Sequence, residues 1–284
     1  MMPLLPLIRL MRPHQWFKNI FVFAGLLFSY QWGQGHIVQQ VLLAALAFSA
    51  CSSLIYILND WLDRESDALH PTKRHRPLAS GEVSPKAALV LAALLLLASV
   101  LLAWGNPLLL LLLGLYLVLN LAYNWRLKRV PVVDVSSIAA GFMLRLLAGT
   151  QAVGIPPSHW LLLTGLFIAL FLGFSKRRAE TFHDAESQRA VMEHYPPALL
   201  DTYIASTMTA TVITYGLYAT SPEARLQHGE HLAYTLPVVV FGMLRYAYQA
   251  HRGRGEDVSR DLVRDPWLVT SGLVWLLLFL APHF

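Results

Sequence analysis

The residues best suited to chemistry are acidic side chains that directly follow a long apolar run. Residues 59–67 read NDWLDRESD. On a helix of about 3.6 residues per turn, Asp60, Asp63 and Asp67 fall within roughly 60° of one another, with Asn59 beside them. Stacked like charges near lipid are unfavourable for packing, but they suit Mg²⁺, which usually takes one or two carboxylates plus substrate phosphates. We therefore predict a Mg²⁺ platform here; the alternative is a solvated helix end.

Basic side chains follow this acidic stripe within the same loop. They are Lys73, Arg74 and Arg76, in a segment interrupted by prolines and a glycine, which cannot remain helical. A diphosphate requires both kinds of group, because a metal bridges its oxygens while arginine binds the others bidentately. A positively charged loop that merely orients the protein in a membrane would explain the cations but not the adjacent carboxylates.

The composition is that of a membrane protein. Of 284 residues, 56% are hydrophobic and only 14% are charged, whereas a soluble domain carries about 25% charged residues. Several apolar runs reach the roughly 20 residues that cross a bilayer. We predict one all-α, polytopic integral membrane domain over residues 1–284. The net charge of +5 does not indicate nucleic-acid binding, since no such motif accompanies it.

Nine membrane spans are predicted from the apolar runs. Their approximate limits are 15–33, 38–58, 85–104, 107–124, 132–154, 159–175, 200–220, 231–249 and 266–283. The loops between them are either short and nearly neutral or long and charged. Of the 22 Lys and Arg residues, only Arg225 lies in a loop of the first kind. This asymmetry predicts that the charged loops, 59–84 and 176–199 among them, face the cytoplasm together with the N-terminus.

A second group of charges follows the sixth predicted span. Lys176, Arg177 and Arg178 are consecutive, and Glu180 and Asp184 follow them. These cations predict a second phosphate-binding wall; the alternative is an anchor that stops the helix at the membrane boundary.

Other polar residues lie within or beside the spans. Arg145 is inside the fifth span, where a charge costs at least a few kcal/mol and needs a cavity or a partner. Asp134 starts the same span about three turns earlier, so the two could line one face or could each pair with another helix. Lys18, Tyr123 and Lys128 lie at interfacial positions from which they could reach a phosphate site.

Together these segments resemble the UbiA-type membrane prenyltransferase superfamily. The signature is Asn-Asp-x-x-Asp-x-x-x-Asp at 59–67 followed by Lys-Arg-x-Arg-Pro-Leu-x-Ser-Gly at 73–81. Within the superfamily, residues 12–19, 70–74, 127–134, 141–145 and 176–180 are most similar to the decaprenyl-phosphate phosphoribosyltransferases. Aromatic-acceptor members usually carry a second Asp-x-x-x-Asp motif after the sixth span, and this chain has Asp184-Ala-Glu186 there.

The resemblance implies a nine-helix bundle around a cavity open to the cytoplasm, in a bacterial plasma membrane. It implies Mg²⁺-dependent transfer of 5-phosphoribosyl from phosphoribosyl diphosphate to a polyprenyl phosphate of the decaprenyl type, with release of diphosphate. The implied metal ligands are Asn59, Asp60, Asp63 and Asp67, and the implied catalytic residues are Asp60, Asp63, Asp67, Lys176 and Arg177. The implied phosphate-binding residues are Lys18, Lys73, Arg74, Arg76, Tyr123, Lys128, Arg145 and Arg178. A homo-oligomer is left open.

A charge count favours the phosphoribosyl reaction. A prenyl diphosphate brings one cluster of negative charge, whereas phosphoribosyl diphosphate and a polyprenyl phosphate together bring a diphosphate, a 5-phosphate and a lipid phosphate. Anions held away from water need paired cations, and this chain supplies many. Two alternatives remain: prenyl transfer from a prenyl diphosphate to an aromatic or other acceptor, and a non-enzymatic lipid or solute carrier.

Overall fold

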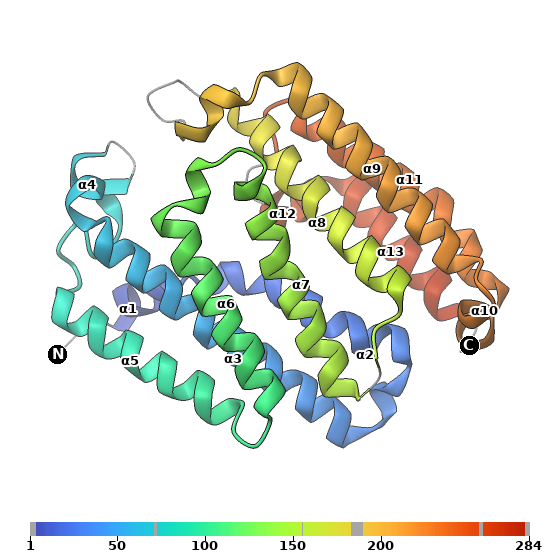
Figure 1. Cartoon of the computed structure of the whole chain (residues 1–284), viewed down its shortest axis with the longest axis horizontal. Coiled ribbons are helices and arrows are strands. Elements are labelled where there is room, and N and C mark those ends of the chain that lie inside the picture. Colours follow the sequence, from blue (N-terminus) through green and yellow to red (C-terminus); the bar gives the residue numbers. More distant parts are fainter. Residues whose placement is uncertain (1–3, 71–72, 155, 183–189, 256–257, 282–284) are drawn as a thin grey trace. The chain divides into compact units, whose positions relative to one another are not determined.

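The computed structural model describes residues 4–70, 73–154, 156–182, 190–255 and 258–281, and every regular element among them is helical. The α-helices are α1 (Leu4–Met11), α2 (Ala24–Ser29), α3 (Gly35–Leu62), α4 (Arg64–Leu69), α5 (Pro85–Leu102), α6 (Pro107–Trp125), α7 (Val133–Val153), α8 (His159–Glu180), α9 (Pro197–Ala219), α10 (Pro222–His228), α11 (Leu236–Ala250), α12 (Val258–Arg264) and α13 (Pro266–Leu280) (Figure 1). Shorter 3₁₀ segments are Pro13–Phe23, Gln31–Gly33, Lys73–His75, Leu127–Arg129, Ala190–His194 and Glu230–Thr235. The all-α prediction is therefore confirmed.

Long apolar helices confirm a multi-pass membrane protein. Among the described residues, five helices are long and apolar enough to cross a bilayer: α3, α5, α6, α7 and α8. The shorter helix α13 is also apolar. Several of these helices begin at local signals; for example, Ser84 and Ser158 each accept a hydrogen bond from a backbone N–H of the first turn that follows.

The first predicted span, 15–33, is not a single α-helix. It consists of the 3₁₀ segment Pro13–Phe23, then α2, then a short 3₁₀ turn. Tertiary packing accounts for the difference, because this segment approaches α7 backbone to backbone. A Cβ added to Gly25 would lie 2.9 Å from the backbone of Thr150. Such contact leaves no room for side chains between the two elements.

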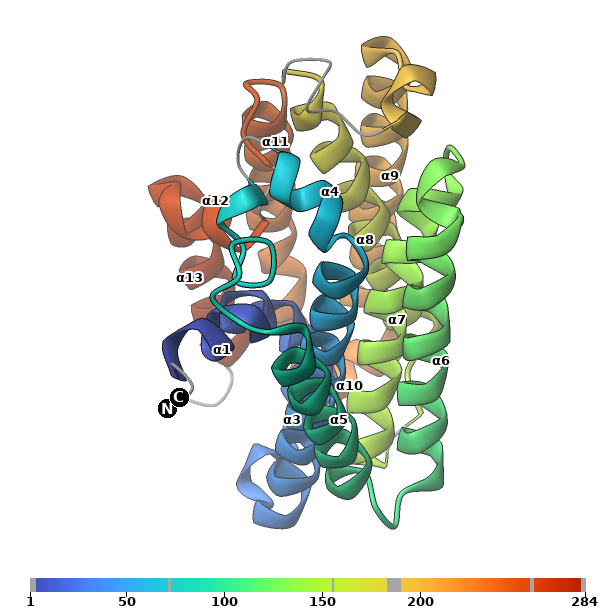
Figure 2. The same ribbon diagram turned by 90° about the vertical axis from the view of Figure 1, so that its left-hand side faces the viewer.

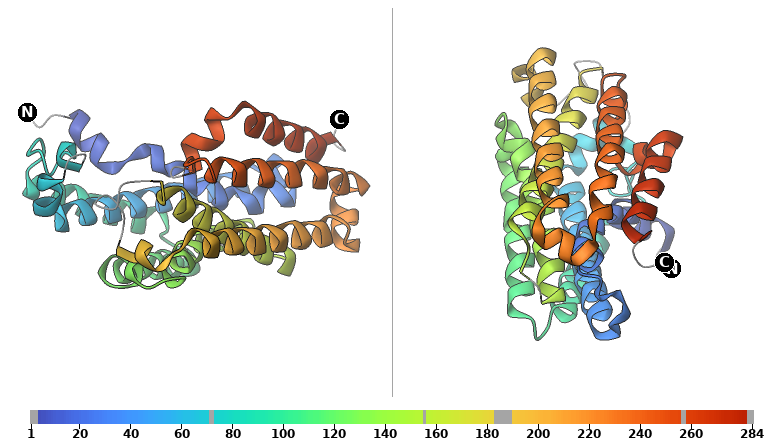
Figure 3. Two further views of the ribbon diagram at one scale, coloured as in Figure 1. Left: turned by 90° about the horizontal axis from the view of Figure 1, so that it is seen from above. Right: turned by 90° about the vertical axis from the view of Figure 1, so that its right-hand side faces the viewer.

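The described chain divides into two compact units. One contains Met1–Trp125 and Leu144–Pro156, and the other contains Arg126–Met143 and Pro157–Phe284, so that α7 contributes residues to both. In the first unit α3 is the most buried long helix, and α5 packs along it (Figure 2). In the second unit α8 packs along α9, and α11 packs along α13 (Figure 3).

Among the glycines of the described residues, Gly149 of α7 approaches a neighbouring backbone most closely. An ideal Cβ at this position would lie 1.8 Å from the carbonyl oxygen of Val22. We expect Gly149→Ala to lower the free energy of unfolding by about 1–3 kcal/mol, the usual effect of overpacking. Thermal unfolding of the detergent-purified protein measures this loss.

The matched control is Gly114→Ala in α6. A Cβ there meets nothing within 4 Å, so only helix propensity changes and stability should rise by up to about 1 kcal/mol. Equal unfolding temperatures for Gly149→Ala and the wild type would contradict the packing described here.

Candidate functional site

The acidic segment of the first unit lies across a break between two helices. α3 ends at Leu62, Asp63 occupies the turn, and α4 begins at Arg64, so the single continuous stripe expected from the sequence is wrong. The break separates the carboxylates by environment. Asp60 and Asp67 are only 2% and 4% exposed, whereas Asp63 is exposed.

Two arginines hold the buried carboxylates. Arg76 Nη1 donates to Asp60 Oδ1 at 3.1 Å and to Asp67 Oδ2 at 2.6 Å, so one guanidinium bridges α3 and α4. Arg12 Nη2 donates to the same Asp60 oxygen at 2.6 Å and lies over the ring of Tyr56. Because both guanidiniums remain partly exposed, they can also reach a bound anion.

Sequence reasoning placed Arg12 in a motif but not in the site. Arg12 follows α1 and has a left-handed backbone with φ 53°, which is uncommon for a residue with a side chain. This conformation turns the chain from α1 into the 3₁₀ segment Pro13–Phe23. In the sequence only the adjacent proline marked Arg12, because Asp60, the carboxylate that it bonds, lies 48 positions away.

The buried pair of carboxylates suits a small cation. Oxygens of Asp60 and Asp67 flank one cationic nitrogen, and a position that favours a guanidinium N–H between two carboxylates also favours an oxygen-liganded ion. Mg²⁺ commonly takes one or two protein carboxylates beside phosphate oxygens and water. Within the described ranges, no group of three or more Asp, Glu, His or Cys side chains is close enough to hold a metal ion. Asp60 and Asp67 are thus the two carboxylates that the structure brings together for such a site.

The remaining predicted residues of the first unit have varied environments. Lys73 and Arg74 are exposed on the turn Lys73–His75, while Asn59, Lys18 and Tyr123 are partly buried. Pro71 and Thr72 of the same motif lie outside the described residues. The basic turn therefore presents two cations to solvent beside the Asp60–Asp67–Arg76 cluster.

Arg145 is buried and bonded within the first unit. Its Nε donates to Asn19 Oδ1 and its Nη2 to the hydroxyl of Tyr116, each at 2.7 Å. Its guanidinium also lies over the rings of Phe48 and Tyr116. The structure therefore gives Arg145 partners on other segments, and both of these partners are uncharged side chains.

Asp134 forms the centre of a buried network in the second unit. Its Oδ2 accepts from Arg177 Nε at 2.7 Å, and the two side chains are 0% and 1% exposed. Arg177 also donates to Glu180 at 2.7 Å. Arg177 therefore lies in an internal ion pair, which differs from the accessible phosphate-binding wall expected for it, because its side chain is directed into the unit.

Tyr195 completes this network and was not predicted from the sequence. Its hydroxyl donates to Asp134 Oδ1 at 2.7 Å and accepts from the backbone N–H of Val132 at 2.5 Å. Burial and the neighbouring carboxylate raise the pKa of Tyr195, so the hydroxyl keeps its proton and can donate it to Asp134. No local sequence pattern marks a tyrosine 61 positions from its partner.

The cations beside Arg177 have different environments. Lys176 is partly buried, and Arg178 donates to Asp201 at 2.7 Å with 14% of its side chain exposed. Lys128 is partly buried on the 3₁₀ turn Leu127–Arg129. Asp184 and Glu186, which follow these cations in the sequence, lie outside the described residues.

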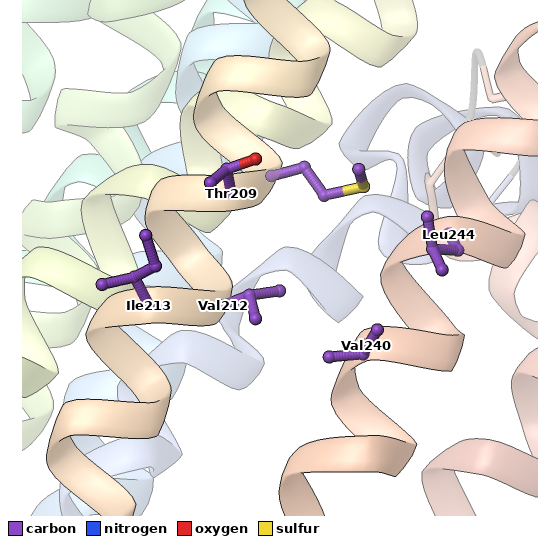
Figure 4. A pocket seen from close by; sticks show the side chains of 6 residues that line it. Thr209, Val212, Ile213, Val240 and Leu244 are labelled. Carbon is purple, nitrogen blue, oxygen red and sulfur yellow. The ribbon is translucent and has the colours of Figure 1, made fainter.

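A small cavity between α9 and α11 is unrelated to this chemistry. Its lining, shown in Figure 4, consists of Met208, Thr209, Val212, Ile213, Val240 and Leu244. No charged side chain lines it, so it offers nothing to a phosphate or a metal ion. The candidate site accordingly consists of the charged clusters and not of this cavity.

Comparison with known proteins gives one consistent result. The sequence pattern that defines the UbiA prenyltransferase family matches residues 19–281. The decaprenyl-phosphate phosphoribosyltransferase of Mycolicibacterium smegmatis is 32% identical, in an alignment that covers 95% of this chain and 90% of that protein. The protein of the same name from Corynebacterium glutamicum is 34% identical, in an alignment that covers 95% of this chain and 84% of that protein.

A solved structure shares the fold. The UbiA homolog from Archaeoglobus fulgidus, described as bound to GPP and Mg²⁺, superimposes with a TM-score of 0.72. The two chains are 21% identical, and the match covers 96% of each.

Proposed function

This chain belongs to the UbiA prenyltransferase family, and from that membership we propose that it transfers the 5-phosphoribosyl group of phosphoribosyl diphosphate to a polyprenyl phosphate. The observation that carries the proposal is the similarity to decaprenyl-phosphate phosphoribosyltransferases along 95% of the chain. The products are polyprenyl-phosphoryl-5-phosphoribose and diphosphate. The charged clusters of the two units support it, since the reaction involves three separate phosphate-bearing groups.

The proposed reaction exchanges one bond at the anomeric carbon. The C1–O bond to diphosphate breaks, its electron pair leaves with the diphosphate, and the ribose carbon develops oxocarbenium character. An oxygen of the lipid phosphate then forms the new C1–O bond. This oxygen is already ionised at neutral pH, so the attack needs no strong general base. The protein's main task is to stabilise the charge that develops on the leaving group.

Residues of the first unit are proposed to bind the diphosphate. Asp60 and Asp67, with Asn59 and Asp63 at the same helix junction, would hold Mg²⁺. When bound, that ion supplies Lewis-acid neutralisation of the departing diphosphate. Arg76 and Arg12 exchange part of their hydrogen bonding from the carboxylates to the phosphate oxygens. Further proposed contacts come from Lys18, Lys73, Arg74 and Tyr123.

Cations of the second unit are proposed to bind another phosphate. Lys176, Arg178 and Lys128 remain partly accessible, so each can donate to the ribose 5-phosphate or to the lipid phosphate. Arg177 and Arg145 are buried and bonded internally. We therefore assign these two arginines a supporting role in the bundle instead of a direct catalytic contact.

The proposed setting is a bacterial plasma membrane crossed nine times by one integral domain. The proposed active loops, 59–84 and 176–199, face the cytoplasm, and the proposed cavity opens to that side. The charge asymmetry of the loops supports this orientation, with only Arg225 among 22 basic residues in a short neutral loop.

A labelling experiment tests the function. Membranes containing the expressed protein are incubated with phosphoribosyl diphosphate labelled in the ribose, decaprenyl phosphate and Mg²⁺. We expect label in the organic phase together with released diphosphate, and loss of both when EDTA removes the divalent ion. Membranes without the protein provide the background.

The alternatives give different products in the same assay. A prenyltransferase for aromatic or other acceptors would leave the ribose label in the aqueous phase and would consume a prenyl diphosphate instead. A carrier would move lipid or solute without releasing diphosphate. If correctly folded protein forms no labelled lipid in this assay, the proposal is refuted.

A further inference from the structure

A continuous chain of hydrogen bonds crosses the second unit beside its proposed phosphate-binding cations. It runs from the backbone N–H of Val132 to the Tyr195 hydroxyl, from that hydroxyl to Asp134, and from Asp134 to Arg177. Every link is between 2.5 and 2.7 Å, and Tyr195 is 2% exposed. Within these three hydrogen bonds, the Tyr195 hydroxyl joins the backbone of Val132 to the side chain of Asp134 on α7.

Val132 has a backbone conformation that needs such support. Its φ of 66° lies in the left-handed region, where a β-branched residue is an outlier. Conformations of this kind persist only where surrounding contacts impose them, and they gather at functional sites. The Tyr195 hydroxyl supplies such a contact, because it accepts the Val132 N–H directly.

The two ends of this chain carry cations. On one side, the turn Leu127–Arg129 precedes Val132 and bears Lys128. On the other side, Arg177 lies between Lys176 and Arg178 at the C-terminal turn of α8. The 3₁₀ segment Ala190–His194, which leads directly into Tyr195, also packs on the Leu127–Arg129 turn. Fixing Val132 and Arg177 therefore fixes the positions from which the neighbouring cations extend.

From these contacts we propose that the Tyr195 hydroxyl is a positioning group that sets Lys128 and Lys176 for one substrate phosphate. The inference rests on the proposed phosphoribosyl transfer. Tyr195 touches no substrate in this scheme and acts only through Val132 and Asp134. Its ring packs in the apolar core of the second unit, so a phenylalanine preserves the packing and removes only the oxygen.

Tyr195→Phe tests the inference against a matched control, Tyr215→Phe. Tyr215 is also buried in the second unit, and its hydroxyl bonds to Thr235 and Trp275, away from the cations. Each variant loses one buried hydroxyl, so similar losses of thermal stability are expected from both. A purely structural role would lower the folded fraction, and hence apparent kcat, without changing KM.

The kinetic experiment therefore determines KM and kcat separately, first with phosphoribosyl diphosphate as the varied substrate and then with decaprenyl phosphate. For Tyr195→Phe we expect the KM of one of the two substrates to rise about tenfold while kcat stays within about twofold of the wild-type value. This pattern is expected because the lost contact stabilises the bound substrate and the transition state equally. The substrate affected identifies whose phosphate the cations hold. For Tyr215→Phe both KM values stay at the wild-type level. Unchanged KM values for both substrates in Tyr195→Phe overturn the inference.

A second readout does not depend on activity. Release of Val132 should loosen the preceding turn, so trypsin should cleave after Lys128 or Arg129 several-fold faster in Tyr195→Phe than in the wild type or in Tyr215→Phe. If labelled lipid never forms but this cleavage accelerates, the proposed function is refuted, while the role of the Tyr195 hydroxyl in fixing the turn is supported. If labelled lipid forms and the turn is cleaved at the wild-type rate, the proposed function is supported, while the positioning role of the Tyr195 hydroxyl is refuted.

Discussion

Asp60→Asn is expected to lower the rate of phosphoribosyl transfer by about 10²–10³-fold, the usual cost of removing one electrostatic group that acts in the transition state. Asp60 has the most buried carboxylate of the acidic segment, and two arginines converge on one of its oxygens. The asparagine keeps the shape but removes the charge that would hold a divalent ion. Initial rates with labelled phosphoribosyl diphosphate at saturating Mg²⁺ measure the effect.

The bundle should survive this substitution. Arg12 and Arg76 keep 25% and 29% of their side chains exposed, so water can solvate the charge that loses its partner. Thermal unfolding should therefore shift little. Glu65→Gln is the control, because Glu65 is 85% exposed and bonds only to Arg64 in the described contacts. Full activity in Asp60→Asn, or an equal loss in Glu65→Gln, would contradict the metal assignment.

Asp134→Leu is expected to lower the free energy of unfolding by about 3–5 kcal/mol, because it leaves a buried guanidinium without its principal counter-charge. The Asp134–Arg177 pair is almost completely excluded from solvent. Tyr195 also loses its acceptor. Chemical unfolding in detergent, followed by helical content, gives the magnitude.

The double variant Asp134→Leu/Arg177→Met separates charge burial from packing. Replacing a buried ion pair by apolar groups of similar volume is often neutral, so the double variant should recover most of the stability lost in the single variant. Glu180, the other partner of Arg177, is 15% exposed and can be hydrated. Glu65→Gln again provides the surface comparison, with an effect below about 1 kcal/mol. A double variant as unstable as Asp134→Leu would show that the charge is not the cause.

The helical membrane architecture could be predicted from the sequence because its causes are local. Apolar runs of sufficient length, ended by proline, glycine and charge, gave most helix positions within a few residues of those observed. The predicted spans 85–104 and 107–124 correspond to α5 and α6, for example. The prediction of residues 15–33 as a single helical span was wrong. Close backbone contact through Gly25 and Gly149 sets the conformation of this segment, and the local sequence does not reveal such contact.

Part of the candidate site was also determined locally. Asp60, Asp67 and Arg76 lie within 17 positions of one another, so their residue types and spacing were enough to predict a diphosphate site. The helix break at Asp63 could not be predicted in this way, because helical periodicity in the sequence does not indicate a change in the direction of the helix axis.

Only the tertiary structure distinguished the three consecutive cations 176–178. In the sequence they are equivalent, yet successive helical residues point about 100° apart, so only one of them can face Asp134. Which one does so depends on how α8 is rotated against its neighbours, and the answer is Arg177. The sequence by itself thus determined the class of protein through local composition, and the spacing of its charged residues predicted a phosphate-bearing ligand. Tertiary packing decided which charges are buried in pairs and which remain accessible to a phosphate, because burial depends on contacts between residues that are distant along the chain.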